Sequence, residues 1–335
     1  MSILKKVRFA IEWSAVAAAA KVVPFLSRPM CHRLAQIGGA LASHIDRHGR
    51  RVALANLEAV FGDELSATER ARITRKSFQH FARTMIDLLW SPRLTRDNFR
   101  EFIDIENIDF LHSETAKGKG VIFACTHYGN FEWMSHAAGF AGFRSVVLAQ
   151  EFKNPWLEPI FKRLREVSGH TVIARKGGMG RVYKALRRGG CTALLVDLTV
   201  KAGSEAVPIE CLDLKKSVTL APAWLQQRTG GAIVPAHCEA LAGGQYRLVF
   251  HPKIEIPTGS TYQEVAQACW DVFEPHIRSN PAPWLWMYKH WRYRPADAAR
   301  PYPFYASFSR AFQEVLAQTA GVHEDSDLAL ETTSD

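Results

Sequence analysis

The sequence lacks the cysteine patterns that mark metal centres and disulfide frameworks. No two cysteines form a C-x-x-C pair, and none stands in a cluster with histidine. The six cysteines are Cys31, Cys125, Cys191, Cys211, Cys238 and Cys269. Thiols scattered in this way are typical of reduced, buried cysteines in a protein that faces the cytoplasm. We therefore expect no metal ligands and no disulfide framework.

Several catalytic motifs are missing as well. There is no G-x-S-x-G string, which argues against an α/β-hydrolase, and no H-E-x-x-H string, which argues against a zinc protease. The glycine-rich turn at residues 174–178 completes neither G-x-G-x-x-G nor G-x4-G-K-[ST], so it is only a weak sign of phosphate binding. These absences leave other kinds of group transfer open.

Acidic residues are outnumbered by basic ones. Lys and Arg total 42 against 33 Asp and Glu, a net charge of +9, and 47% of the 335 residues are apolar. This surplus suits an anionic partner such as nucleic acid, phospholipid headgroups or an acidic carrier protein. Nucleic acid is the least supported, because there is no zinc-ligand spacing, RNP-like strand or long Lys/Arg block. A soluble protein that merely happens to be basic is the alternative.

The long apolar run lies at the N-terminus, between Phe9 and Leu26, and it is interrupted by Glu12 and Lys21. A bilayer-spanning helix needs about 20 apolar residues, so this run is of borderline length. No small-x-small cleavage site precedes a clearly exported domain. We expect residues 1–46 to form an uncleaved membrane anchor that crosses the bilayer once or lies in its interface. A buried hairpin of the core is the alternative. Flanking arginines favour a cytoplasmic position for the rest of the chain.

Residues 121–134 carry the most informative pattern. An apolar run stops at His127, and the glycine at position 129 opens an amphipathic segment whose first turn holds Glu132. This pattern predicts a buried strand that turns directly into a helix. Glu132 could then orient His127 as a general base near neutral pH, and the backbone N–H groups around Gly129 and Asn130 could hold an anion or a developing oxyanion. A capped structural histidine is the alternative, and a Cys125 nucleophile is conceivable.

The rest of the chain alternates between strand-like and helix-like runs. Residues 50–90 have helical periodicity, with a break at Gly62-Asp63 and a cap at Ser66 or Thr68. Strands are predicted at 145–149, 170–174, 191–196, 232–236 and 246–250, and helices near 155–167, 179–188 and 218–229. Such alternation predicts an α/β fold with a mixed central sheet flanked by helices. We expect the main domain at 47–305, and a C-terminal helix with an acidic, disordered tail at 306–335.

The string Thr126-His127-Tyr128-Gly129-Asn130-Phe131-Glu132 resembles the T-H-x-G-N-[WF]-E signature of the bacterial lipid A biosynthesis acyltransferases, the late lauroyl and myristoyl transferases. The stretch from Arg51 to Gly62 resembles the R-x3-N-L…F-P segment of the same family. The resemblance implies an α/β/α fold like that of glycerolipid acyltransferases. It also implies that His127 deprotonates a lipid hydroxyl while Glu132 orients the histidine, without a cofactor or a metal.

The resemblance also implies partners and a location. We expect acyl carrier protein or acyl-CoA as donor, an anionic glycolipid such as a lipid A precursor as acceptor, and the cytoplasmic face of the bacterial inner membrane. A phosphatidylinositol mannoside or a lysophospholipid is an alternative acceptor. A non-catalytic lipid-binding module of the same fold is a second alternative, although such a module would need neither His127 nor Glu132.

Further segments supply candidate substrate-binding residues beside Gly129 and Asn130. Arg175 stands where the family carries an arginine, which implies contact with a phosphate or the acyl thioester; a solvated arginine is the alternative. Asp197 and Glu210 are candidate carboxylates near the site, or else surface or cap residues. At these two places the sequence departs from the family, because Leu198 replaces a glutamine and Glu210-Cys211 interrupts an aromatic string.

The segment from Pro283 to Pro295 resembles the closing P-x-Q-W-x-W-x-H-R-R-W string of the family. Its tryptophans alternate with Lys and Arg, a composition that suits a membrane interface. A structural closing element with ordinary core tryptophans is the alternative.

Overall fold

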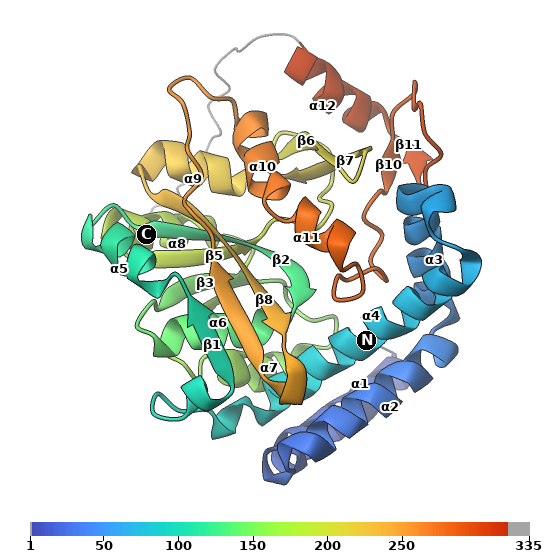
Figure 1. The fold of residues 1–335 in the computed structure, drawn as a ribbon, viewed down its shortest axis with the longest axis vertical. Coiled ribbons are helices and arrows are strands. Elements are labelled where there is room, and N and C mark those ends of the chain that lie inside the picture. The colour runs from blue at the N-terminus through green and yellow to red at the C-terminus, as the bar shows by residue number, and fades with distance from the viewer. Residues whose placement is uncertain (1, 321–335) are drawn as a thin grey trace.

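The computed structural model describes residues 2–320, and within them seven strands form a central sheet (Figure 1). The strands are β1 (Ile103–Glu106), β2 (Val121–Gly129), β3 (Ser145–Ala149), β4 (Thr171–Ala174), β5 (Cys191–Leu195), β8 (Ala232–Ala240) and β9 (Tyr246–Phe250). Their order is β1-β9-β8-β2-β5-β3-β4. The strands β8, β2, β5, β3 and β4 run parallel to one another. β9 is antiparallel to β8, and β1 is parallel to β9. The predicted mixed α/β sheet is confirmed.

Helices cover both faces of the sheet. They are α5 (Ile108–Ala116), α6 (Phe131–Phe140), α7 (Glu158–Arg165), α8 (Met179–Arg187), α9 (Ala221–Thr229), α10 (Tyr262–Asp271) and α11 (Glu274–Ser279), whereas α12 (Arg310–Ala320) lies away from the sheet (Figure 1). The central strand β2 contributes to both sides because successive side chains of a strand point to opposite faces. Ile122 and Ala124 join the core under α8, α9 and α10, while Val121, Phe123 and Cys125 join the core under α5 and α6. This explains why the run is apolar without alternation.

The end of β2 carries a bulge that prepares the site. β2 pairs with β8 in continuous register up to Cys125↔Ala236, and pairing resumes at Gly129↔Cys238. β2 therefore has two more residues than β8 between these pairs, and His127 is in the bulged segment. Gly129 has φ 63°, and a Cβ there would lie 1.7 Å from the carbonyl oxygen of Cys238. Glycine is thus required where the strand turns into α6.

Four helices precede the sheet: α1 (Ile3–Val22), α2 (Arg28–Ile45), α3 (Arg47–Phe61) and α4 (Ala67–Trp90). The break predicted after α3 is present at Gly62, and Ser66 caps α4 in a capping box with Glu69. Small residues of α2 face α4, and a Cβ on Gly39 would lie 2.4 Å from the Cα of Gln79. α2 therefore packs very closely along α4.

The outer faces of α1 and α2 are apolar and exposed. Phe9 and Ala20 are the buried residues of α1. The exposed apolar residues of these two helices and their connection are Ile3, Leu4, Val7, Ile11, Trp13, Val22, Phe25, Met30, Leu34, Ile37, Leu41 and Ile45. Between residues 2 and 320, no helix has the length and apolar character needed to cross a bilayer. The single-pass form of the expected anchor thus has no support, and the exposed residues do not fit a core hairpin either.

Two small two-stranded sheets lie outside the central sheet. β6 (Ala206–Cys211) and β7 (Leu214–Thr219) form an antiparallel hairpin that packs against α10 and α12, and β10 (Tyr293–Arg294) pairs with β11 (Ser307–Phe308). The acidic tail expected after Gly321 lies outside the described residues. The domain boundaries at 46/47 and 305/306 stay predictions.

Candidate active site

His127 lies in the bulge of β2, near the edge at which the carboxyl ends of the parallel strands meet. Its side chain is 12% exposed. The imidazole packs edge-on against the ring of Phe131, the first residue of α6, with a centroid distance of 4.8 Å. The first-turn N–H groups of a helix carry the positive end of its dipole. A partly exposed imidazole therefore stands beside the N-terminus of a helix.

Asp197 is the carboxylate that holds this imidazole. Its Oδ1 lies 2.8 Å from Nδ1 of His127, and its Oδ2 accepts hydrogen bonds from the backbone N–H of His127 at 3.0 Å and from Nε1 of Trp284 at 2.9 Å. Since an ionised carboxylate can only accept, Nδ1 carries the proton and Nε2 keeps its lone pair. This is the arrangement of a histidine general base.

The charge of Asp197 is secured by its surroundings. The residue is completely buried, and burial alone would raise the pKa of the carboxyl. The charge and hydrogen bond of His127 outweigh burial, together with His290 and Lys216, and hold the pKa of Asp197 well below its usual range. The carboxylate is therefore ionised at neutral pH, and it can stabilise a protonated His127.

Two buried polar residues stand behind Asp197. Lys216 donates to the backbone oxygen of Asp197 at 2.6 Å, and burial lowers its pKa. The ring of His290 stacks on Trp284 at 3.9 Å, and burial lowers the pKa of His290 to about 3. The Nε2–H of this neutral ring donates to the backbone oxygen of Leu285 at 2.9 Å. These contacts fix the strand end that carries Asp197.

The segment from Pro283 to Pro295 contributes its three tryptophans to the core. Trp284, Trp286 and Trp291 are all 0% exposed. The expectation that these tryptophans sit at headgroup depth is wrong, because no part of them reaches the surface. Through Trp284 and His290 the string instead supports the carboxylate of the site.

Glu132 has a different partner from the one expected. Its side chain is 7% exposed and accepts from Nη2 of Arg165 at 2.6 Å and from Nε of Arg165 at 3.1 Å. The charge of Glu132 raises the pKa of Arg165 although burial acts in the opposite direction. Where Glu132 was expected to hold His127, the structure has Asp197 in that position. Glu132 instead neutralises the guanidinium of Arg165 on α7.

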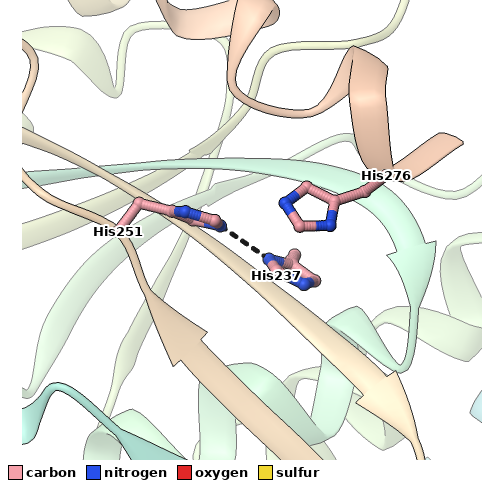
Figure 2. Close-up of side chains that lie close together, drawn as sticks. All are labelled: His237, His251 and His276. Carbon is pink, nitrogen blue, oxygen red and sulfur yellow. Dashed lines mark hydrogen bonds between the residues drawn. The ribbon is translucent and has the colours of Figure 1, made fainter. Parts of the chain in front are cut away.

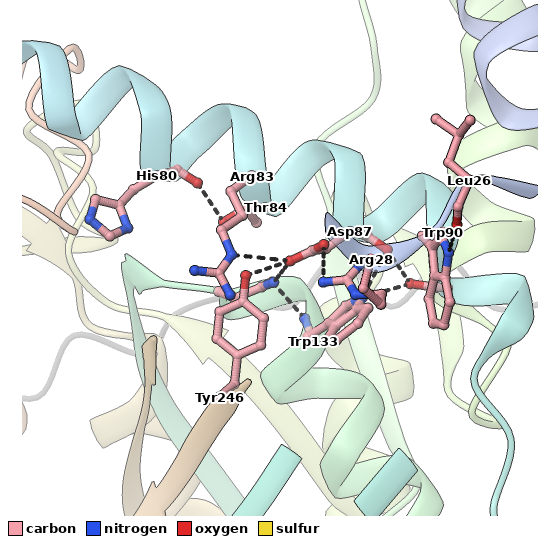
Figure 3. A network of polar contacts seen from close by, with 11 residues as sticks. Leu26, Arg28, His80, Arg83, Thr84, Asp87, Trp90, Trp133 and Tyr246 are labelled. Carbon is pink, nitrogen blue, oxygen red and sulfur yellow. Dashed lines mark hydrogen bonds and ion pairs between the residues drawn. The ribbon is translucent and has the colours of Figure 1, made fainter. Parts of the chain in front are cut away.

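Asn130 organises the turn after His127 and binds Asp87, whose other polar contacts are drawn in Figure 3. Its Oδ1 accepts from the backbone N–H of Trp133 at 3.0 Å and caps α6, while its Nδ2 donates to Asp87 at 2.9 Å. Asp87 also pairs with Arg28 at 2.7 Å and accepts the hydroxyl of Tyr246. Asn130 is 1% exposed. Both ends of its amide are thus engaged within the protein, and its predicted contact with substrate stays a prediction.

Arg175 and Glu210 are the remaining residues that the sequence offers as substrate contacts. Arg175 directly follows β4 and is exposed. The hydroxyl of Tyr288 donates to the backbone oxygen of Thr199, two residues after Asp197. Glu210 lies on β6, and its backbone bonds with the side chain of Gln267 on α10. Glu210 thus lies in a separate hairpin, and the contact of Arg175 with substrate stays a prediction.

Cys125 has the properties of a core residue. It is 2% exposed, and burial raises the pKa of its thiol above the usual value. A thiol in this state is a poor nucleophile. The alternative of a Cys125–His127 pair therefore loses its support.

Comparison with known proteins covers most of the chain. The model of a family described as "Bacterial lipid A biosynthesis acyltransferase" matches residues 1–293. A phosphatidylinositol mannoside acyltransferase of Mycolicibacterium smegmatis is 27% identical over 278 residues, which cover 79% of this chain and 88% of that protein. A lipid A biosynthesis palmitoleoyltransferase of Escherichia coli is 22% identical over 79% of this chain and 85% of its own length. A lipid A biosynthesis lauroyltransferase of the same organism is 22% identical over 88% and 95%.

Proposed function

Because the chain belongs to the family of bacterial lipid A biosynthesis acyltransferases, we propose that it moves a fatty acyl group from an acyl thioester to a hydroxyl of a glycolipid, with His127 as general base. The observation that carries this proposal is the 2.8 Å contact between Nδ1 of His127 and the buried carboxylate of Asp197. That contact leaves the lone pair of Nε2 for the proton of an acceptor hydroxyl.

The proposed reaction has two steps. Nε2 of His127 takes the hydroxyl proton while the acceptor oxygen attacks the thioester carbonyl, and Asp197 stabilises the imidazolium. The tetrahedral intermediate then collapses, the C–S bond breaks, and the imidazolium returns its proton to the thiolate. The first-turn N–H groups of α6, which begins at Phe131, are suited to hold the oxyanion. Glu132 acts in this scheme as a positioning residue, through Arg165.

The acceptor we favour is a lipid A precursor. The family description and the two Escherichia coli relatives support it. A phosphatidylinositol mannoside is the second candidate, because the relative from Mycolicibacterium smegmatis has the higher identity, 27% against 22%. Incubation of the purified enzyme with each acceptor, followed by mass spectrometry of the products, separates the two. Acylation of the mannoside alone would overturn the lipid A assignment.

The donor we favour is acyl carrier protein, with acyl-CoA as the alternative. Acyl carrier proteins are small and acidic, so a basic docking surface would steer them. Exposed basic residues lie on two separate helices: Lys162 and Arg163 on α7, and Arg181, Lys184 and Arg187 on α8, which Arg188 follows. Arg165, on the same helix as Lys162, is the partner of Glu132. Docking on α7 would thus bring the thioester toward Glu132 in the first turn of α6.

The location we propose is the surface of the bacterial inner membrane, on its cytoplasmic face. The exposed apolar residues of α2 recur at positions 30, 34, 37, 41 and 45, which lie on one side of a helix. Such a stripe fits the interface between headgroups and acyl chains, and this position needs no spanning helix. Arg33 is exposed on the same helix and can meet lipid phosphates.

The test of the proposed function is acyl transfer by the purified His127→Ala variant. Because only proton transfer is lost, the rate should fall about 10²- to 10⁴-fold while the protein stays folded and binds vesicles as before. His48→Ala, at an exposed position on α3, is a matched control that should keep full activity. Near-normal transfer by His127→Ala would exclude His127 as the base.

A further inference from the structure

Three histidines from separate elements converge on one another outside the proposed catalytic centre. His237 lies on β8, His251 directly follows β9, and His276 is on α11 (Figure 2). One ring nitrogen of each lies within 4.8 Å of those of the other two. The ring of His237 is 4.3 Å from that of His276 and 4.9 Å from that of His251, measured between centroids. The residues are far apart in sequence, so no spacing pattern indicates the cluster.

The tautomer of His237 is defined by its neighbours. Its Nε2 lies 3.1 Å from Oε1 of Glu239, and an ionised carboxylate accepts, so Nε2 carries the proton. Its Nδ1, 2.8 Å from Nε2 of His251, therefore presents a lone pair toward the other rings. A carboxylate behind the distal nitrogen of a histidine is the usual support of a metal-bound imidazole.

The three rings are shielded from solvent to different extents. His237 is 2% exposed, and His251 and His276 are partly buried. Neutral imidazoles retain the lone pairs that a metal ion needs.

We propose that His237, His251 and His276 form a binding site for a single zinc ion. Zinc prefers four ligands in a tetrahedron with Zn–N distances of about 2.0–2.1 Å, which separates nitrogen ligands by about 3.3 Å. The present nitrogen positions need small rotations to reach this geometry. In the metal-free protein the Nε2–H of His251 donates to Nδ1 of His237. On binding, that proton moves to Nδ1 of His251, so no net proton is lost.

A metal ion here would hold together the elements that pack beside His127. Tyr128, the neighbour of His127, packs edge-on against His237 at 6.1 Å, and its hydroxyl donates to the backbone oxygen of Asn280 after α11. The ion would thus join β8, the end of β9 and α11 around the bulge that carries His127. Its role is structural, and three protein ligands leave one position for water.

The experiment uses tag-free, full-length protein that has been treated with a chelator and then titrated with Co²⁺ and Zn²⁺. We expect one equivalent of Co²⁺ to give the intense visible absorption of a tetrahedral site, and Zn²⁺ to displace it and raise the melting temperature. Absence of this spectrum from the folded wild-type protein would overturn the proposal.

Variants connect the signal to these residues. His251→Gln and His276→Gln, at partly exposed positions, should each lose the Co²⁺ spectrum without loss of helical circular dichroism. Glu239→Gln should keep the spectrum but bind about 10- to 100-fold more weakly. His48→Ala should bind like the wild type, since His48 is exposed on α3. Equal binding by wild type and His251→Gln would place the metal elsewhere and refute the site.

Discussion

Nδ1 of His127 and Oδ1 of Asp197 are 2.8 Å apart, although 70 residues separate them in the chain. His127 is in the bulge of β2 and Asp197 follows β5, and the two strands are neighbours in the sheet. The pairing therefore depends on the sheet order. It makes Asp197 the carboxylate in contact with His127, whereas Glu132 contacts Arg165.

Asp197→Asn should lower the rate of acyl transfer about 10²- to 10⁴-fold, because an amide cannot stabilise the imidazolium and can favour the wrong tautomer of His127. The Michaelis constants should change little. Steady-state kinetics on variants matched for melting temperature tests this. Asp104→Asn, at an exposed position on β1, is the control that should behave like wild type. A rate within twofold of wild type for Asp197→Asn would remove Asp197 from the mechanism.

Glu132 and Arg165 should behave as one unit. If Glu132 acts through Arg165, then Glu132→Gln, Arg165→Gln and the double variant should lose similar amounts of activity, with strong non-additivity in the cycle. The ion pair is buried on the Glu132 side, so each single change also leaves a charge uncompensated. Independent, additive losses would show instead that Glu132 acts directly on His127.

His290 should make stability depend on pH. Burial lowers the pKa of His290 to about 3 in the folded protein, against about 6.5 for an exposed histidine. The unfolded chain therefore binds more protons between these values, so this stabilisation is fully present above pH 6.5 and is lost as the pH falls toward 3. One buried histidine of this kind should cost about 2 kcal/mol between pH 7 and pH 5.

Urea unfolding of wild type and His290→Gln at both pH values tests that cost. The variant should be less stable at pH 7 but show a smaller change with pH. His44→Gln, at an exposed position on α2, should retain the pH dependence of wild type. An identical slope for His290→Gln and wild type would contradict the prediction.

The apolar face of α2 should bind lipid. Ile37→Lys combined with Leu41→Lys should reduce binding to anionic vesicles by tenfold or more, because two buried apolar side chains are worth several kcal/mol at such an interface. Sedimentation with vesicles measures binding, and hydrolysis of a soluble thioester monitors the integrity of the site. Phe308→Lys, at an exposed apolar position on β11, is the matched control. Unchanged sedimentation of the α2 variant would assign that face to another partner.

Charge reversal at Arg187 and Arg188 should raise the KM for an acyl carrier protein donor and leave kcat nearly unchanged. Both residues are exposed at the end of α8, so the attraction should weaken steeply with salt, given a screening length of about 10 Å at 0.1 M. A short acyl thioester without the carrier should be turned over as before. Equal losses with both donors would place these arginines at the lipid instead.

Several elements could be predicted from the sequence because their signals are local. The apolar runs at 145–149 and 246–250 became β3 and β9 with the expected bounds, and Ser66 caps α4. Position 129 required a glycine, and the structure explains it through the bulge against β8. Periodicity and turn chemistry act over a few residues, so they are visible without the fold.

The partners in the site could not be predicted in the same way. The five-residue step from His127 to Glu132 suggested a pair, but α6 turns Glu132 toward Arg165 on α7. Lys216 gave no signal, since a lysine in a strand is normally exposed, whereas here it is 1% exposed against Asp197. His237, His251 and His276 also meet only after β8, β9 and α11 have assembled.

Asp87 on α4 connects the N-termini of two other helices, α2 and α6. One of its oxygens pairs with Arg28 in the first turn of α2, and the other accepts from Asn130, the cap of α6. Since α2 carries the exposed apolar stripe and α6 begins four residues after His127, one carboxylate connects both. If α2 adsorbs to lipid as proposed, a tilt or rotation of this helix would therefore strain the cap of α6. The proposed adsorption would then be mechanically coupled to the geometry of the base through the side chain of Asp87.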